Sequence, residues 1–590
     1  MQNLPPSAPA RGLLALVLMA SPALAQDAAV SAAPQTPTSQ EVTTPEGILR
    51  PVRREAAPAG RLPTIPSPLA DGVSADARVT AVALNYCRAA LHRIRRQPTP
   101  EVLSEERDRI LDNLNLSGIA DAEVIALYSA LLEEISGVHL TRADRKLTSG
   151  HHSRSIRRKA VWDVLAFSTQ LATAQFTSAV RTGADSWWDM RDMAYRRDTD
   201  LLQIERKRLD AVVDKSQMFL DTFWRLARKR QIPDAWLVRG QDLDRLARAN
   251  TETDPSVRLR RLRRLEAYLV AYPPYWYHLA RTQQELGDYA AAVQTYTSLE
   301  ALEAGHFRVD EMLAASLANR ALLEDELGMA TAGATARRAL AAAPDVWQAN
   351  LAAARVLQRG GQLAMAEEAI LRNVDSGLEL ATSQTFRLGL YYHSGDDEKL
   401  RAALADVEVV RHAAAPAVIR CLTRLEPHEQ PQVAMAELSR SLAAYPRLTF
   451  GSDELVLAAD DRWRLGTAGW SFPVLARGNT RPELRTVRGG HQARFSGPFE
   501  WGNPLRTTET LEVDVVLTYP DATRVSLTLR EVPGAYVAAR PTAGQRSMPS
   551  RITQRTVLSI ASVRSDGTLV SFENAQPVRA AELPRDFAIE

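Results

Sequence analysis

The side chains best suited to chemistry in this chain are its two cysteines, ten histidines and 70 carboxylates, and their spacing limits what that chemistry could be. Cys87 and Cys421 lie too far apart in the sequence for a zinc site. They read either as two small buried side chains or as the partners of one long-range disulfide in an oxidising compartment. His151 and His152 have no Cys or carboxylate at metal-ligand spacing and read as surface residues. We therefore expect no metal and no cofactor.

The sequence also lacks the motifs of the common enzyme classes. It has no Gly-x-Ser-x-Gly nucleophile, no phosphate-binding loop, no His-Glu-x-x-His and no dinucleotide fingerprint. Its carboxylates fall on the polar faces of expected helices, where solvation is their ordinary state. The chain is therefore predicted not to be an enzyme, although catalytic groups that meet only in the folded protein would leave no motif. The formal net charge of +2 argues against nucleic acid as a partner.

The N-terminal residues read as an export signal. In residues 1–25, Arg11 precedes an apolar run that ends at Met19, and Ala23-Leu24-Ala25 is a small-x-small cleavage site. The apolar run is too short to span a bilayer, so we expect no transmembrane segment in the mature chain. Residues 26–73 are rich in Ala and Pro and are expected to be a disordered linker. These features predict a periplasmic or secreted protein.

Two adjacent tryptophans, Trp187 and Trp188, lie in an all-α region that we expect at residues 74–240. Helical spacing of apolar residues over 153–182 and 185–230 predicts two long helices, which most simply form an antiparallel hairpin. The tryptophans near its turn either fill the core of the hairpin or form a docking tip for a protein partner.

Residues 272–299 read as two short helices joined by a turn at Gly287. Large residues alternate with small ones, so an aromatic ring can fill the space beside an alanine. Such a pair of helices buries only part of its apolar surface and needs neighbouring pairs to cover the rest. The residues expected to pack this unit are Trp276, Leu279, Ala280, Gly287, Tyr289, Ala292 and Tyr296.

This pattern resembles the tetratricopeptide repeat (TPR) family, whose helix–turn–helix unit has a period of about 34 residues. Gly361 and Gly395 are 34 residues apart and mark further units. A weaker unit around Gly328 contains an insertion near residues 304–308. The resemblance covers residues 242–446 in about five units, one strong and the others degenerate.

The resemblance implies a superhelix of stacked helix pairs whose concave face holds an extended peptide or a helix of a partner. In equivalent places of their units, Arg281 and Arg355 would either grip a carboxylate through paired hydrogen bonds or be ordinary surface arginines. The lysine and asparagine set of the carboxylate-clamp TPR proteins is missing, so that specificity does not carry over. The residues that the family geometry places on the concave face are Tyr277, Arg281, Gln284, Arg355, Gln358 and Tyr392.

Two-residue alternation replaces the helical spacing near the C-terminus. After an array at residues 241–448 and a transition at 449–483, in which residues 455–465 could form a capping helix, residues 484–580 are expected to form a small antiparallel, sandwich-like β domain. The expected fold class is mainly α, with a long helical hairpin, a TPR-like α-solenoid and a C-terminal β domain.

These expectations favour an exported scaffold that binds protein partners in the assembly or regulation of a cell-envelope complex. Two alternatives stay open. One is an envelope enzyme that acts on polysaccharide or peptidoglycan and uses the repeats as a docking arm. The other is an oligomeric structural component built on the long hairpin.

Overall fold

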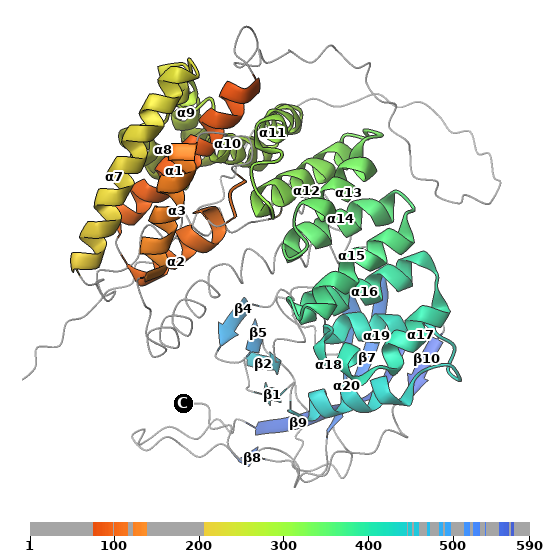
Figure 1. Ribbon diagram of the computed structural model, residues 1–590. Helices are drawn as coiled ribbons and strands as arrows, with labels where there is room; N and C mark the ends of the chain where they lie inside the picture. The colour runs from red at the N-terminus through yellow and green to blue at the C-terminus, as the bar shows by residue number, and fades with distance from the viewer. Residues whose placement is uncertain are drawn as a thin grey trace, which may run out of the picture. The chain divides into compact units, whose positions relative to one another are not determined.

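The computed structural model of the chain is mostly helical, with an antiparallel sheet near the C-terminus, which confirms the expected mixture of a large α part and a smaller β part (Figure 1). The expected export signal, the linker and the tryptophan pair lie outside the described residues. The described residues are 75–97, 99–111, 113–115, 122–137, 184, 206–444, 447–450, 454–459, 469–471, 483–487, 490–496, 512–519, 523–531, 537–538, 554–565 and 568–571.

The N-terminal helices pack around one apolar core. Thr99 caps α2 by accepting a hydrogen bond from the amide of Val102 at 3.3 Å, and Pro100 occupies the first turn, where its missing N–H costs nothing. Phe219 and Phe223 of α7 are fully buried in this core. The elements are α1 (Ala75–Arg96), α2 (Pro100–Glu106), η1 (Arg107–Leu111), α3 (Ala122–Gly137) and α7 (Arg206–Lys229).

The expected long hairpin is described only in part. Helix α7 covers residues 206–229 of its second arm, and α7 packs against α3 and α1. The first arm, residues 153–182, lies outside the described residues. The antiparallel hairpin therefore stays a prediction.

From residue 234 onward the chain forms successive paired helices, which follow one another in Figure 1. We call the elements from η2 to α20 the paired-helix array. Its elements are η2 (Asp234–Trp236), α8 (Gly240–Asn250), α9 (Pro255–Arg263), η3 (Glu266–Tyr268), α10 (Pro273–Glu285), α11 (Tyr289–Glu303), α12 (Glu311–Glu326), α13 (Ala332–Ala342), α14 (Trp347–Arg359), α15 (Leu363–Asp375), α16 (Leu380–Ser394), α17 (Asp397–Ala405), α18 (Val407–His412), α19 (Ala415–Arg424) and α20 (Gln432–Ala444).

Four glycines end the first helix of a pair in the same way. Gly287, Gly328, Gly361 and Gly395 have φ angles between +69° and +83°. In each case the amide of the following residue donates to the carbonyl five residues earlier, at 2.7–3.2 Å. This is the Schellman type of helix end, which needs a left-handed residue that only glycine adopts without steric cost.

The helices preceding these glycines form a continuous row. Helix α12 contacts both α10 and α14, and α14 contacts α16. Each second helix packs against its own first helix and against the next one, as α11 does with α10 and α12. We call α10, α12, α14 and α16 the first-helix row.

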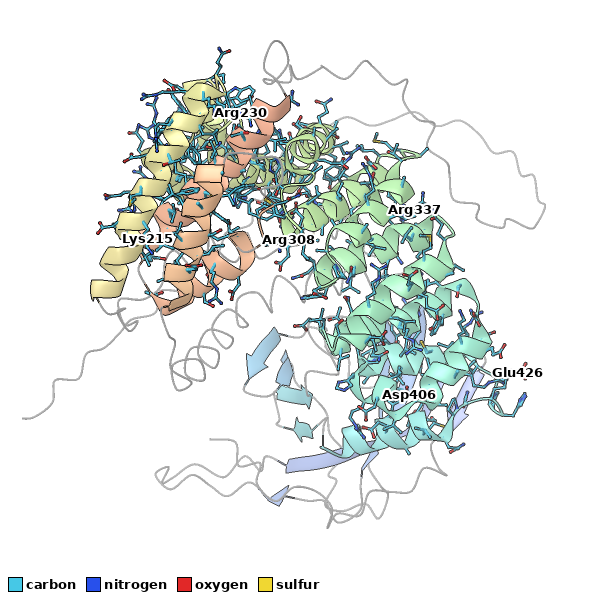
Figure 2. The ribbon with its side chains drawn as sticks, in the orientation of Figure 1. Lys215, Arg230, Arg308, Arg337, Asp406 and Glu426 are labelled. Carbon is cyan, nitrogen blue, oxygen red and sulfur yellow. The ribbon has the colours of Figure 1, made fainter. Side chains whose placement is uncertain are left out.

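The expected insertion has a structural role. Gly287 and Gly328 are 41 residues apart, and the extra residues form the loop at 304–310 between α11 and α12, which we call the insertion loop. Figure 2 labels Arg308 of this loop, and its amide donates to the carbonyl of Asn113 at 3.1 Å. The amide of Asn115 donates to the carbonyl of His306 at 2.6 Å. The insertion loop therefore joins the array to the chain that follows α2 and η1.

The β strands pair antiparallel along one path, β3-β6-β7-β9-β1-β2-β5-β4, with β10 and β8 also on β9. Strand β9 pairs with β1 and β8 through its first residues and with β7 and β10 through the rest. The strands are β1 (Arg447–Phe450), β2 (Glu454–Ala459), β3 (Gly469–Ser471), β4 (Glu483–Val487), β5 (Gly490–Ser496), β6 (Glu512–Thr518), β7 (Arg524–Glu531), β8 (Val537–Ala538), β9 (Gln554–Ser565) and β10 (Thr568–Ser571).

Two sequence expectations are settled by these elements. Residues 455–459 lie in strand β2 and not in a capping helix, because β2 pairs with β1 on one side and β5 on the other. Cys87 and Cys421 are both free and buried, so they act as small apolar side chains and not as a disulfide. Burial raises the pKa of each thiol to about 12, which keeps it protonated and unreactive.

Candidate functional site on the first-helix row

The residues expected to pack the unit at 272–299 lie in the core between α10 and α11. The indole Nε1 of Trp276 donates to the carbonyl of Val270 at 2.9 Å, which fixes the ring at the start of α10. Leu279, Ala280, Ala292 and Tyr296 are buried. Tyr289 is half-buried against the same core.

The residues expected on an open concave face are mostly enclosed. Tyr277 and Gln284 are fully buried, and Arg281 and Arg355 are each only 9% exposed. Gln284 is used inside its own helix pair, because its Oε1 accepts a hydrogen bond from the hydroxyl of Tyr296 at 2.9 Å. This hydrogen bond commits the side-chain oxygen of Gln284 to its own helix pair.

Two of the expected residues lie together and one lies elsewhere. Arg355 donates from Nη1 to Oε1 of Gln358 at 2.8 Å, one turn along α14. Tyr392 stands at the other end of the row, where the guanidinium carbons of Arg420 and Arg424 lie 4.5 Å and 5.5 Å from its ring centre. The structure therefore divides the expected set between α10, α14 and the end of α16.

Arg355 is a buried cation with unused hydrogen-bonding capacity. Its Nε has no partner, and no carboxylate of the described residues forms an ion pair with it. The nearest acid, Asp325, is held at 2.6 Å by Arg359 instead. Burial and the charge of Arg359 lower the pKa of Arg355 to about 10, so it stays protonated at neutral pH.

The most specific contact on the row is made by Asn319 of α12, a residue that sequence reasoning did not single out. Its Nδ2 donates to the carbonyl of Ala184 at 2.9 Å, and its Oδ1 accepts a hydrogen bond from the amide of the same residue. Both residues are fully buried. One carboxamide therefore satisfies both main-chain groups of a residue that is 135 positions away in the sequence.

A carboxamide can make this pair of bonds only with an extended residue. In a β conformation the N–H and C=O of one residue point to the same side, as in a hydrogen-bonded pair of antiparallel strands. In a helix they point in opposite directions along the axis. Asn319 therefore binds the main chain at Ala184 in the way that a neighbouring strand would.

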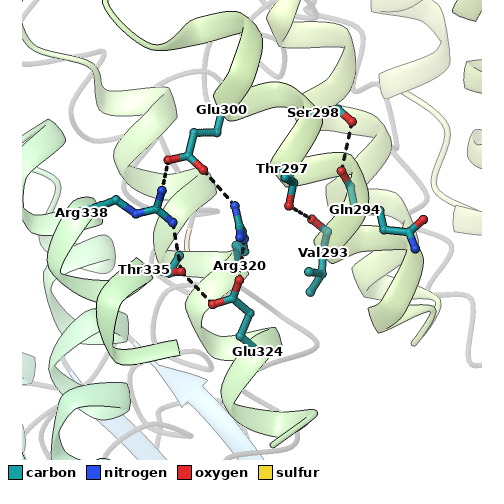
Figure 3. Close-up of polar contacts among 9 residues, drawn as sticks. All are labelled: Val293, Gln294, Thr297, Ser298, Glu300, Arg320, Glu324, Thr335 and Arg338. Atoms are coloured by element: carbon teal, nitrogen blue, oxygen red, sulfur yellow. Dashed lines mark hydrogen bonds and ion pairs between the residues drawn. The ribbon is translucent and has the colours of Figure 1, made fainter. Parts of the chain in front are cut away.

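Helix α12 is fixed in place by a polar network beside Asn319 (Figure 3). Arg320 pairs with Glu324 at 2.6 Å and with Glu300 of α11 at 2.9 Å. Glu300 also pairs with Arg338 of α13 at 2.5 Å, and the hydroxyl of Thr335 donates to Glu324 at 2.8 Å. Because these bonds reach both flanking helices, they set the rotation of α12 and thereby the direction of Asn319.

The turn spacing carries no signal for Asn319. Nine residues before the turn glycine, the units have Asn319, His278, Ala352 and Phe386. Because these side chains share no chemistry, aligning the units on their glycines does not single out the amide or its partner at Ala184.

Neither a metal site nor a membrane-spanning helix is found within the described residues. No group of three His, Cys, Asp or Glu side chains there is arranged to hold a metal ion. Every helix that the structure describes is too short or too polar to cross a membrane. Trp187 and Trp188, the expected docking tip, and the histidines at 151 and 152 lie outside those ranges.

Comparison of the chain with protein-family models, with curated proteins and with solved structures finds no match. The function of the chain is therefore inferred from the geometry of its own residues.

Proposed function

We propose that this protein is an exported scaffold whose paired-helix array, a TPR-like α-solenoid, binds an extended segment of a protein partner in the assembly or regulation of a cell-envelope complex. The observation that supports this most directly is the pair of hydrogen bonds between Asn319 and the main chain at Ala184. The export signal expected at residues 1–25 supports the envelope location.

Binding through hydrogen bonds to the main chain of an extended segment suits a scaffold protein. Main-chain hydrogen bonds supply affinity for an extended chain of many sequences, and side-chain contacts then supply specificity. Arg355, on the next helix of the row, offers a buried cation for an acidic group of the partner. Binding would be lost if the amide that holds the main chain were replaced by an apolar group of similar size.

Affinity capture from the native envelope tests the proposal. The bait is the full-length protein, compared with Asn319→Leu and with Gln294→Leu, an amide-to-leucine change on α11, outside the first-helix row. We expect proteins captured by wild type to be reduced at least tenfold with Asn319→Leu and unchanged with Gln294→Leu, because a partner segment that takes the place of Ala184 on Asn319 would lose two main-chain bonds only in the first. Equal recovery of the same partners by all three baits would contradict the proposal.

Circular dichroism of each bait separates loss of binding from loss of fold. If Asn319→Leu unfolds, Asn319→Asp serves instead, because it keeps the acceptor for the amide and loses the donor for the carbonyl. We expect that variant to recover the same partners in a smaller amount.

A further inference from the structure

Two buried carboxyl groups stand where the insertion loop begins and ends. Glu303 is the last residue of α11, and Asp310 precedes α12 and caps it by accepting the amide of Leu313 at 2.7 Å. Glu303 is fully buried and Asp310 is 6% exposed. The hydroxyl of Tyr86 on α1 donates to Oε2 of Glu303 at 2.6 Å. The pair therefore lies between the array and the N-terminal helices.

The two acids lie close enough for each to shift the pKa of the other. The remaining oxygens, Oε1 of Glu303 and Oδ2 of Asp310, are buried and have no donor from the protein. Ionised carboxylates only accept hydrogen bonds, so a bond between two of them needs a proton on one. One shared proton supplies the donor that both oxygens lack.

The groups around the pair offer no positive charge to replace that proton. Tyr86 of α1 faces Glu303, Tyr272 lies beside Tyr86, and Glu311 of α12 adds a further negative charge near Asp310. His306 of the insertion loop is buried, and burial lowers its pKa to about 4, so it is neutral above that pH. Removal of the proton would leave two negative charges together in a site that excludes water, which is strongly unfavourable.

The same place carries the contact between the insertion loop and residues 113–115. The side chain of Asn113 donates to the carbonyl of Val309 at 2.6 Å and accepts the amide of Val309 at 3.0 Å. The ring of Phe307 stands edge-on to Tyr86, with centroids 4.7 Å apart. The conformation of the loop between the two acids therefore decides whether this contact forms.

We propose that Glu303 and Asp310 share one proton and that this proton keeps the insertion loop closed on residues 113–115, so that its release to water opens the contact. The device is a proton-dependent latch between the N-terminal helices and the array, independent of what the first-helix row binds. A separate contact, in which the amide of Val238 donates to Oδ1 of the buried Asn85 at 3.0 Å, holds α1 without any titrating group.

The direction of the pH dependence follows from the acids. Burial and the charge of Asp310 raise the pKa of Glu303 well above its usual value. Burial raises the pKa of Asp310 to about 7, even though the amide of Leu313 opposes the rise. In the open state, where the acids meet water, an Asp or Glu has a pKa of about 4. Below that pH the acid is protonated in both states and the closed state keeps its full stability. As pH rises from there towards the raised pKa of the closed state, that stability is lost. The latch therefore weakens between about pH 4 and pH 7.

Hydrogen–deuterium exchange of the full-length protein between pH 5 and pH 7 tests the latch. The amides of Asn115 and Arg308 donate across the contact, and the amide of Val238 is the internal reference. After correction for intrinsic exchange, we expect protection of the first two to fall up to about tenfold per pH unit and that of Val238 to stay level.

Substitutions identify the source of the pH dependence. In the double variant Glu303→Gln with Asp310→Asn neither side chain titrates, so protection of Asn115 and Arg308 should change less than about twofold per pH unit. Asp310→Asn alone leaves Glu303 to titrate and should flatten the slope in part; it keeps the helix cap, so it replaces the double variant if that fails to fold. Glu398→Gln, an exposed change in α17, should keep the wild-type slope. A level wild-type profile, or a wild-type slope in both latch variants, would overturn the proposal.

Discussion

Where it meets the N-terminal helices, the paired-helix array is held by a buried acid pair, a tyrosine hydroxyl and main-chain hydrogen bonds, whereas at its C-terminal end it is held by an arginine between two tyrosine rings. Arg420 of α19 lies 4.5 Å from the ring of Tyr392 and 5.0 Å from that of Tyr519, which follows β6. The hydroxyl of Tyr519 donates to the carbonyl of Pro416 at 2.6 Å.

The two ends differ in how they respond to protons. An arginine stays charged at all physiological pH values, so the C-terminal contacts do not depend on pH in that range. The acid pair loses its shared proton near neutrality, so the N-terminal contact does. The array therefore has one contact that depends on pH and one that does not. In both contacts a buried tyrosine hydroxyl donates to an oxygen, Tyr86 to Glu303 and Tyr519 to the carbonyl of Pro416.

The largest effect is expected from Tyr86→Phe at the N-terminal end. The hydroxyl of Tyr86 donates to Glu303, and loss of this bond should lower the free energy of unfolding by about 2 kcal/mol at pH 8, above the pKa of about 7 of Asp310, where the acid pair carries more negative charge. At pH 5 the loss should be about 1 kcal/mol, because the acid pair then carries less negative charge. Urea unfolding at both pH values measures the difference. Tyr268→Phe, at a residue that is 48% exposed, is the control.

A smaller and pH-independent effect is expected from Tyr519→Phe at the C-terminal end. Its hydroxyl donates to a main-chain carbonyl, so the loss should be about 1 kcal/mol and equal at pH 5 and pH 8. The same urea series gives the result. If the two tyrosine variants showed the same pH dependence, the distinction between the ends would be wrong.

The smallest effect is expected from Arg420→Met, which keeps much of the side-chain length and removes the charge. Loss of the cation–π contacts with Tyr392 and Tyr519 should cost about 0.5–1 kcal/mol at any pH between 5 and 8. Urea unfolding followed by circular dichroism measures the cost at each pH. A cost that grew or vanished across this pH range would show that a titrating group shares the C-terminal contact.

Local signals in the sequence located the turns of the array. A glycine in the left-handed region ends each first helix, and Asp288 and Asp396 then cap the next helix by accepting the amides of Ala291 and Lys399. Each of these features spans only a few residues, so a single sequence shows it. The alternation over residues 511–517 and 525–529 likewise corresponds to the paired strands β6 and β7.

The contacts that give the array its proposed functions join distant residues, and no local pattern shows them. In the sequence Glu303 and Asp310 resemble ordinary helix-surface acids, because nothing nearby indicates that Tyr86, 217 residues earlier, donates to Glu303. The partner of Asn319 lies 135 residues earlier. Gln284, expected on the concave face, is fully buried and accepts a hydrogen bond from Tyr296 in its own helix pair.

The contact at Ala184 has a consequence for variation among sequences. Asn319 bonds only to atoms that every residue type except proline shares, so these two hydrogen bonds do not select the side chain at position 184. Selection comes from packing instead: Ala184 is fully buried, so a larger side chain there would overpack the site. Substitution by another small residue can therefore leave both bonds unchanged.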